Sequence, residues 1–183
     1  IAPRSPLFLA LAVPGIGLAA EFPLTVQTSA GNVVVEQVLA GLSIPWGMTF
    51  LPDGRALVTE RPGSLRLVDV EHGTSAQVKG VPAVAAMNQG GLLDVQVHPD
   101  FASEPYVYLC YSVGKERQLT TRLARYRLEG DALVDEAVLF TGEPWLATVH
   151  HFGCRVHLDG KGHIFFSIGD RGERDLSQRL DGD

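Results

Sequence analysis

The chain has 183 residues, of which 45% are hydrophobic, and a formal net charge of −6 from 15 Lys and Arg against 21 Asp and Glu. This length and apolar content suffice for one globular domain with a core of ordinary size. The acidic balance, without a basic stripe or an interleaving of basic and aromatic residues, argues against a nucleic-acid partner.

The first twenty residues differ in composition from the remainder. Arg4 is followed by a short apolar run at residues 7–13, and small residues lead up to Glu21. This pattern is typical of a secretory signal peptide cleaved near Ala20, and it predicts a periplasmic or secreted protein. The run is too short and too rich in Pro and Gly for stable membrane insertion, although a buried first strand or a lipid-facing anchor is an alternative. Residues 21–32 then form a leader to the first strand.

The two cysteines, Cys110 and Cys154, form no CxxC pair and have no metal-binding spacing. Export would allow a disulfide between them. The sequence does not show whether their Cα atoms come close enough, so a bridge and two buried free thiols both remain open.

Short apolar or alternating runs, broken by Gly, Pro and Asp, dominate the chain after the leader. A strand is expected at residues 33–39, and an antiparallel meander follows, with strands at residues 46–51, 56–60 and 65–69. Residues 52–55 (PDGR) form a tight turn in this meander, because Pro presets φ at one corner and Gly tolerates positive φ at the other.

The same pattern returns twice. The second copy has strands within residues 91–101, 106–112 and 121–128, and the third has strands within residues 154–162 and 163–170. The turn aspartates Asp53, Asp100 and Asp159 recur at intervals of about 50 residues, the period of four-stranded propeller blades. A plain β-sandwich would turn at shorter, less regular intervals. The sequence therefore predicts an all-β propeller.

Residues 33–183 hold about three blades of four-stranded antiparallel sheet at this period. Propellers usually close with four to eight blades, and the last residues are a polar loop without a closing strand. We therefore expect the chain to be the N-terminal part of a longer propeller, with sheet edges and blade faces left uncovered.

Two adjacent histidines, His150 and His151, precede the third copy. Histidine is the side chain most easily poised to take a proton near neutral pH, and Arg155 nearby can hold an anion or a carboxylate. By itself such a pair is more often part of a solvated loop than a catalytic base.

Three motifs in order resemble the soluble PQQ-dependent sugar dehydrogenases, the glucose/sorbosone dehydrogenase family that includes the periplasmic aldose sugar dehydrogenases. The motifs are residues 45–54 (PWGMTFLPDG), 88–101 (NQGGLLDVQVHPDF) and 151–155 (HFGCR). The resemblance runs from about Val34 to the end of the chain. It implies a six-bladed propeller, export, PQQ and calcium as cofactors, oxidation of an aldose at its anomeric carbon to a lactone, and a downstream electron acceptor.

The resemblance also implies roles for single residues. His151 matches the catalytic histidine, which takes the proton from the anomeric hydroxyl while hydride passes to the quinone. Gln89 matches a glutamine that contacts the cofactor and faces the substrate, and Arg155 matches an arginine for which we expect structural support. The positions that border the sugar pocket are His150, Asp170, Asp175 and Leu176.

Two positions depart from the family pattern. The residue before the catalytic histidine is usually Asp or Asn and is His150 here, which removes an acidic partner that could orient the base. Cys154 replaces a small residue, usually Gly or Ala. The cations that neutralise the PQQ carboxylates, like the calcium ligands, come from later blades in the family. We therefore expect them beyond Asp183, no metal site within this chain, and little activity of the chain alone.

Two other functions are alternatives. A metal-dependent propeller lactonase would need clustered Glu, Asn and Asp along the axis, for which Asp94, Asn88 and Glu60 are available. A non-catalytic binding propeller predicts that His151 is buried or turned away from the axis. The sugar dehydrogenase predicts that His151 and Gln89 project to the same central end of the blades.

Overall fold

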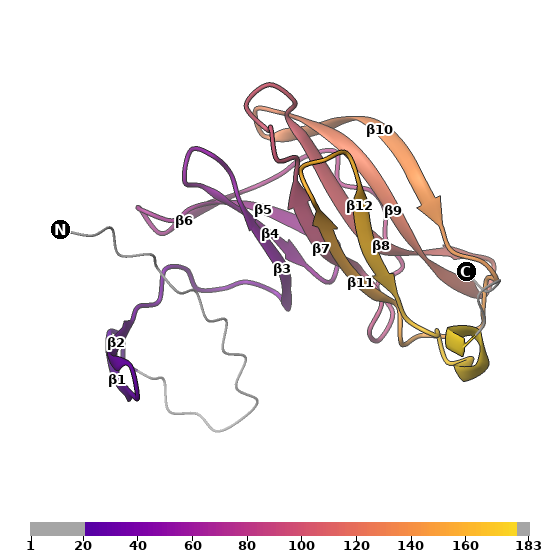
Figure 1. Cartoon of the computed structure of the whole chain (residues 1–183), viewed down its shortest axis with the longest axis horizontal. Helices are drawn as coiled ribbons and strands as arrows, with labels where there is room; N and C mark the ends of the chain where they lie inside the picture. The colour runs from indigo at the N-terminus through magenta and orange to yellow at the C-terminus, as the bar shows by residue number, and fades with distance from the viewer. Residues whose placement is uncertain (1–20, 179–183) are drawn as a thin grey trace. The chain divides into compact units, whose positions relative to one another are not determined.

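The computed structural model describes residues 21–178, apart from the side chain of Leu176 (Figure 1). The signal peptide predicted at residues 1–20 lies outside these residues. The chain divides into two compact units between Gln37 and Val38. Within the described range, no helix has the length and apolar character needed to cross a membrane.

The N-terminal unit contains a hairpin of β1 (Leu24–Thr28) and β2 (Gly31–Val35). The strands are antiparallel, with Thr28 opposite Gly31 at the turn. The strand expected at residues 33–39 therefore begins and ends earlier, and its partner lies in the stretch expected to be a leader. Alternation of Leu24 and Val26 with polar residues is the strand pattern that the sequence analysis overlooked.

The first sheet of the second unit has four antiparallel strands in the order β3-β4-β5-β6. They are β3 (Pro45–Phe50), β4 (Ala56–Glu60), β5 (Ser64–Asp69) and β6 (Thr74–Gln77). The expected meander is confirmed. Strand β6 was not predicted, because its short polar sequence is exposed throughout and has no apolar alternation.

The second sheet also has four antiparallel strands, β7 (Leu92–Val97), β8 (Tyr106–Lys115), β9 (Gln118–Glu129) and β10 (Ala132–Thr141). Strand β10 was not predicted. Its pairing with β9 shifts register twice, between Val134 and Ala137 and between Val138 and Phe140. Each bulge moves the following side chains to the other face, which hides the period of two that marks a strand.

The third sheet consists of β11 (Gly153–Leu158) and β12 (Ile164–Ile168), followed by the 3-10 helix η1 (Arg174–Gln178). Two strands were expected here, within residues 154–162 and 163–170, and both are present. The first strands of successive sheets, β3, β7 and β11, lie next to one another (Figure 1). This arrangement confirms the predicted class: an all-β fold whose antiparallel sheets are consecutive blades of a partial propeller.

Strands β7, β8 and β9 of the second sheet are buried on both faces, whereas β10 is mostly half-buried or exposed. Strand β8 shows how the sequence specifies this burial. Side chains alternate between the two faces of a strand. Val107, Leu109 and Tyr111 pack in the core shared with the first sheet, whereas Tyr108 and Cys110 pack in the core shared with the third sheet. A strand with two buried faces is encoded by a continuous apolar run, which β8 has.

The hydroxyl of Thr59 joins the first sheet to the second. Thr59 is fully buried on β4; its Oγ1 donates to the Leu93 carbonyl at 2.6 Å and accepts the Gly47 N–H at 2.8 Å. A Cβ at Gly47 would lie 2.8 Å from the Leu93 carbonyl oxygen. Glycine at this position therefore permits the close approach of β3 and β7.

A disulfide between Cys110 on β8 and Cys154 on β11 joins the second sheet to the third. Their Cα atoms are 5.7 Å apart, which resolves the question that the sequence left open. The two residues are 44 positions apart in the chain. Closing a loop of that size stabilises a fold by about 4 kcal/mol in the chain-entropy description.

Replacing Thr59 by Val keeps the side-chain volume but deprives the buried Gly47 N–H of its acceptor. We expect the free energy of unfolding to fall by about 1–3 kcal/mol, measured by urea unfolding followed through tryptophan fluorescence. The matched control is Thr74→Val on the exposed strand β6, which should change stability by less than about 0.5 kcal/mol. Equal effects of both variants would show that the hydroxyl of Thr59 does not hold the sheets together.

Candidate functional site

The segment before β11 and the segment after β12 meet at one end of the third sheet. Gly153 lies opposite Ile168 in this antiparallel pair. Continuing that register by two residues places His151 opposite Asp170. His151 Nδ1 lies 2.8 Å from Asp170 Oδ1. A hairpin register thus joins an imidazole to a carboxylate 19 positions away in the chain.

Asp170 determines which ring nitrogen of His151 carries the hydrogen. The Gly172 N–H, which donates to the Asp170 carboxylate at 2.8 Å, and the His151 ring hold the pKa of Asp170 below its ordinary value. An ionised carboxylate can only accept hydrogen bonds, so His151 Nδ1 is the donor. In the neutral ring, Nε2 then keeps its lone pair and can accept a proton. The His151 side chain is 55% exposed, within reach of a bound molecule.

The backbone of His151 is held by the segments on either side. Its N–H donates to Gln89 Oε1 at 2.9 Å, and its carbonyl accepts the Arg171 N–H at 3.1 Å. The Gln89 N–H in turn donates to the Val149 carbonyl at 3.1 Å. The structure therefore brings Gln89 and His151 together at the same end of the blades, as the sugar dehydrogenase prediction requires.

The turns around His151 have unusual backbone conformations. His151, Cys154 and Arg171 have φ values of 58°, 75° and 50°. Residues with large side chains rarely adopt the left-handed region, and such residues cluster at functional sites, where the surrounding structure holds them in place. Gly169 allows the two turns to pack closely, because a Cβ there would overlap the His151 carbonyl oxygen.

Arg171 is a buried residue of the site that the sequence analysis missed. Its Nη1 donates to the Gly169 carbonyl at 3.1 Å and its Nη2 to the Glu143 carbonyl at 3.0 Å. The side chain therefore ties the turn after β12 to the segment that leads into β11. An arginine between an aspartate and a glycine in a polar turn is expected to be solvent-exposed, so the local sequence carries no signal for this role.

His150 supplies no acidic partner at the position before His151, and the orienting carboxylate comes from Asp170. The half-buried His150 ring instead packs edge-on against the His151 ring, with centroids 4.6 Å apart. Asp175 is exposed in η1, and among the described residues no hydrogen bond or ion pair joins it to His151. The side chain of Leu176 lies outside the described part of the chain. The substrate roles of His150, Asp175 and Leu176 stay predictions.

Arg155, for which structural support was expected, contacts a buried carboxylate away from His151. Its Nη1 donates to Asp94 Oδ1 at 3.2 Å, and the Val156 N–H donates to Asp94 Oδ2 at 2.7 Å. Burial raises the pKa of Asp94, although the Val156 N–H and the charge of Arg155 act in the opposite direction. The contact links β11 to β7, so it can support the structure, as expected for Arg155.

Two of the three residues that a metal-dependent lactonase would use, Glu60 and Asp94, are engaged in other contacts. The buried Glu60 carboxylate accepts hydrogen bonds from Arg66 Nε and from the Ser43 N–H, and Asp94 is engaged by Val156 and Arg155 as above. Among residues 21–178, no three His, Cys, Asp or Glu side chains are grouped so that they could hold a metal ion.

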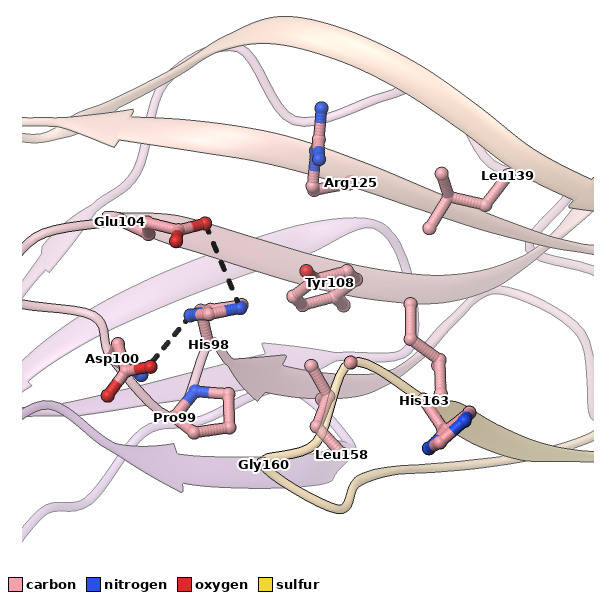
Figure 2. A pocket seen from close by; sticks show the side chains of 12 residues that line it. His98, Pro99, Asp100, Glu104, Tyr108, Arg125, Leu139, Leu158, Gly160 and His163 are labelled. Carbon is pink, nitrogen blue, oxygen red and sulfur yellow. Dashed lines mark hydrogen bonds and ion pairs between the residues drawn. The ribbon is translucent and has the colours of Figure 1, made fainter.

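A cavity of about 400 Å³ lies at the opposite end of the sheets, between the β7–β8 and β11–β12 turns (Figure 2). His98 and Glu104 face each other there at 3.9 Å. His98 Nδ1 also accepts the Asp100 N–H at 3.2 Å, as a turn histidine does. Neither His151 nor Gln89 lines this cavity, which is therefore separate from the candidate site.

The fold and the site together define a class of protein: a β-propeller that presents a His–Asp pair and a glutamine side by side at one end of its blades. Comparison with known families agrees. The family model described as Glucose / Sorbosone dehydrogenase matches residues 42–183. The chain belongs to this family, which confirms the resemblance seen in the sequence motifs.

Two characterised relatives illustrate the similarity. The chain is 41% identical over 154 residues to aldose sugar dehydrogenase YliI of Escherichia coli K12, covering 82% of this chain and 42% of that protein. It is 30% identical over 173 residues to quinoprotein glucose dehydrogenase B of Acinetobacter calcoaceticus, covering 86% and 36%. The chain therefore spans less than half the length of these relatives.

Solved structures give the same result. The apo form of the soluble aldose sugar dehydrogenase of Escherichia coli superposes with a TM-score of 0.72 at 41% identity, covering 77% of this chain and 42% of that one. The PQQ-bound form of aldose sugar dehydrogenase from Streptomyces coelicolor superposes with a TM-score of 0.73 at 29% identity, covering 82% and 45%.

The His151–Asp170 contact makes the pKa of Asp170 a readout of the site. Because this pKa is lowered in the folded chain, the contacts of the Asp170 carboxylate stabilise the fold at neutral pH, and this contribution is lost as the pH falls through the lowered pKa. His151→Ala removes one of those contacts, so we expect the pKa of Asp170 to rise towards its ordinary value in a carboxyl ¹³C NMR titration.

Asp159 is the internal control for this titration. Its pKa is lowered by the Lys161 N–H and by His163, independently of His151, and it should not change in the His151→Ala variant. An equal change in the pKa of both carboxyl groups, or no change in the pKa of Asp170, would contradict the pairing of His151 with Asp170.

Proposed function

We propose that the complete protein to which this chain belongs oxidises an aldose sugar at its anomeric carbon to a lactone, with PQQ as the hydride acceptor. The observation that carries the proposal is the exposed His151, with Asp170 on its Nδ1 and Gln89 on its backbone N–H. Membership of the glucose/sorbosone dehydrogenase family supports it, as does the PQQ-bound form of the Streptomyces coelicolor relative.

The chemistry divides between the cofactor and the chain. PQQ, when bound, supplies the electrophilic quinone that accepts hydride from the sugar carbon. His151 Nε2 takes the proton of the anomeric hydroxyl, because Nδ1 is committed to Asp170. The Asp170 carboxylate holds the ring in this tautomer and stabilises the imidazolium that forms. Positioned general-base catalysis of this kind contributes about 10² to 10⁴ in rate.

Among the described residues, the site offers a hydrogen-bond donor to a PQQ oxygen more readily than it offers cations to the three PQQ carboxylates. The amide NH₂ of Gln89 makes no hydrogen bond within residues 21–178 and can donate to a cofactor oxygen. Two arginines beside the site, Arg61 and Arg171, instead donate to the carbonyls of Gly90 and Glu143. We therefore expect the cations that neutralise the cofactor, and the calcium ligands, to lie outside the described residues, and the chain alone to bind PQQ weakly.

Uncovered apolar surface supports the view that the blades belong to a larger ring. Trp46, Met48 and Phe50 alternate along β3 and are 46%, 41% and 40% exposed. Strand β12 forms an edge of the third sheet. In a closed propeller, sheets on either side would cover these surfaces.

We place the protein in the periplasm or outside the cell, where it would pass electrons to a downstream acceptor. The Cys110–Cys154 disulfide supports this assignment, because disulfides persist in oxidising compartments and are rare in the cytosol. The composition of residues 1–20 points the same way.

Replacing His151 by Gln in the complete protein tests the proposed base. We expect PQQ binding, followed by spectral titration in the presence of calcium, to change little, and turnover of an aldose with a dye acceptor to fall about a hundredfold or more. The matched control is His163→Gln, which breaks a second His–Asp contact of 2.8 Å at the other end of the third sheet. Undiminished turnover in His151→Gln would exclude His151 as the base.

A further inference from the structure

We propose that the Cys110–Cys154 disulfide is a positioning element of the candidate site. It fixes the turn that carries His151 to the neighbouring blade, and so keeps His151 beside Asp170 and Gln89. The catalytic consequence of this inference rests on the proposed function, whereas its structural consequence does not.

The pairing of β11 with β12 is irregular at the start of β11. Cys154 lies three residues after His151, and the register between β11 and β12 shifts between Gly153 and Val156. Regular ladder pairing is therefore interrupted where Cys154 lies. Links to the second sheet replace it: the disulfide holds Cys154, and Thr121 Oγ1 donates to the Phe152 carbonyl at 2.8 Å.

The backbone of this turn also needs to be held in place. His151, Gly153 and Cys154 all have positive φ. Glycine adopts this region without a steric penalty, whereas a residue with a Cβ persists there only when its surroundings enforce it. A covalent bond from Cys154 to another blade is such an enforcement, and it explains how a cysteine is tolerated at this position.

The anchor on the other side of the bridge is rigid. Cys110 is fully buried in β8, which is paired on both sides by β7 and β9. Its cross-strand partner on β7 is Asp94, whose carboxylate accepts the Val156 N–H. Two paired residues of the second sheet thus hold two positions on β11, Cys154 and Val156, that are two residues apart.

A second His–Asp contact in the same sheet shows why the first needs this support. His163 Nδ1 lies 2.8 Å from Asp159 Oδ2, and those residues are four positions apart within one turn. His151 and Asp170 are 19 positions apart and meet only if both ends of the hairpin are held. His163–Asp159 is therefore an internal reference that the disulfide should not affect.

The first test uses the protein without cofactor and compares two disulfide-free variants. Cys110→Ala/Cys154→Ala removes the bridge, and Cys110→Ala/Cys154→Gly removes it while relieving the positive φ at position 154. In both we expect the His151 ring signals to shift or broaden in NMR spectra, and the pKa of Asp170 to rise towards its ordinary value, with His163 unchanged.

Thr59→Val controls for a general loss of stability, because it weakens the contact between the first two sheets instead. It should leave the His151 ring signals and the Asp170 titration as in the wild type. Unchanged His151 and Asp170 signals in a folded disulfide-free variant would overturn the inference. Loss of folding in both double variants, while Thr59→Val stays folded, would show that the disulfide stabilises the whole fold and would contradict a specific positioning role.

The second test uses the complete protein loaded with PQQ and calcium. Small misplacements of a catalytic group cost up to about a hundredfold in rate, so we expect kcat to fall about tenfold in the disulfide-free variants while PQQ affinity stays the same. Parallel loss of PQQ binding and turnover would indicate a general structural effect and contradict a positioning role. Absence of sugar oxidation by the wild type would refute the proposed function, yet the NMR comparison would still decide the role of the disulfide.

Discussion

The contact between His151 Nδ1 and Asp170 Oδ1 is the interaction on which the site depends. It arises from strand pairing: Gly153 lies opposite Ile168, and the chain continues on both sides in the same register. A carboxylate that stays ionised fixes the hydrogen on Nδ1 and leaves Nε2 as the basic atom. The hairpin therefore creates a candidate general base without an acidic neighbour in the sequence.

The second sheet provides the rigid part of the structure around this contact. Both faces of β7, β8 and β9 are buried, so these strands cannot shift without disturbing two hydrophobic cores. The segment that leads into β7 carries Gln89, whose side chain binds the His151 N–H. Site residues on connecting segments are thus positioned by buried strands, which is the usual relation between a functional loop and its scaffold.

The sequence predicted the strands with clear alternation and the turns between them, because period-two patterning and turn residues are local signals. It missed β10, whose bulges break the alternation, and β6, which is short and polar. The partner of His151 was not within reach of sequence reasoning, since counting back from the Asp159 turn places Arg171 opposite it, and only the bulge between Gly153 and Val156 brings Asp170 into that position. The bridge between Cys110 and Cys154 was not within reach either, because it depends on the distance between two blades, to which no local pattern corresponds.

The support of His151 comes mainly from one side. Thr121 binds the Phe152 carbonyl, and Gln89 binds the His151 N–H. Cys110 and Asp94 hold the positions that follow on β11. All four residues belong to the second sheet or to the segment that leads into it. A two-stranded third sheet can therefore carry an ordered candidate site, because the preceding four-stranded blade determines where its first strand begins.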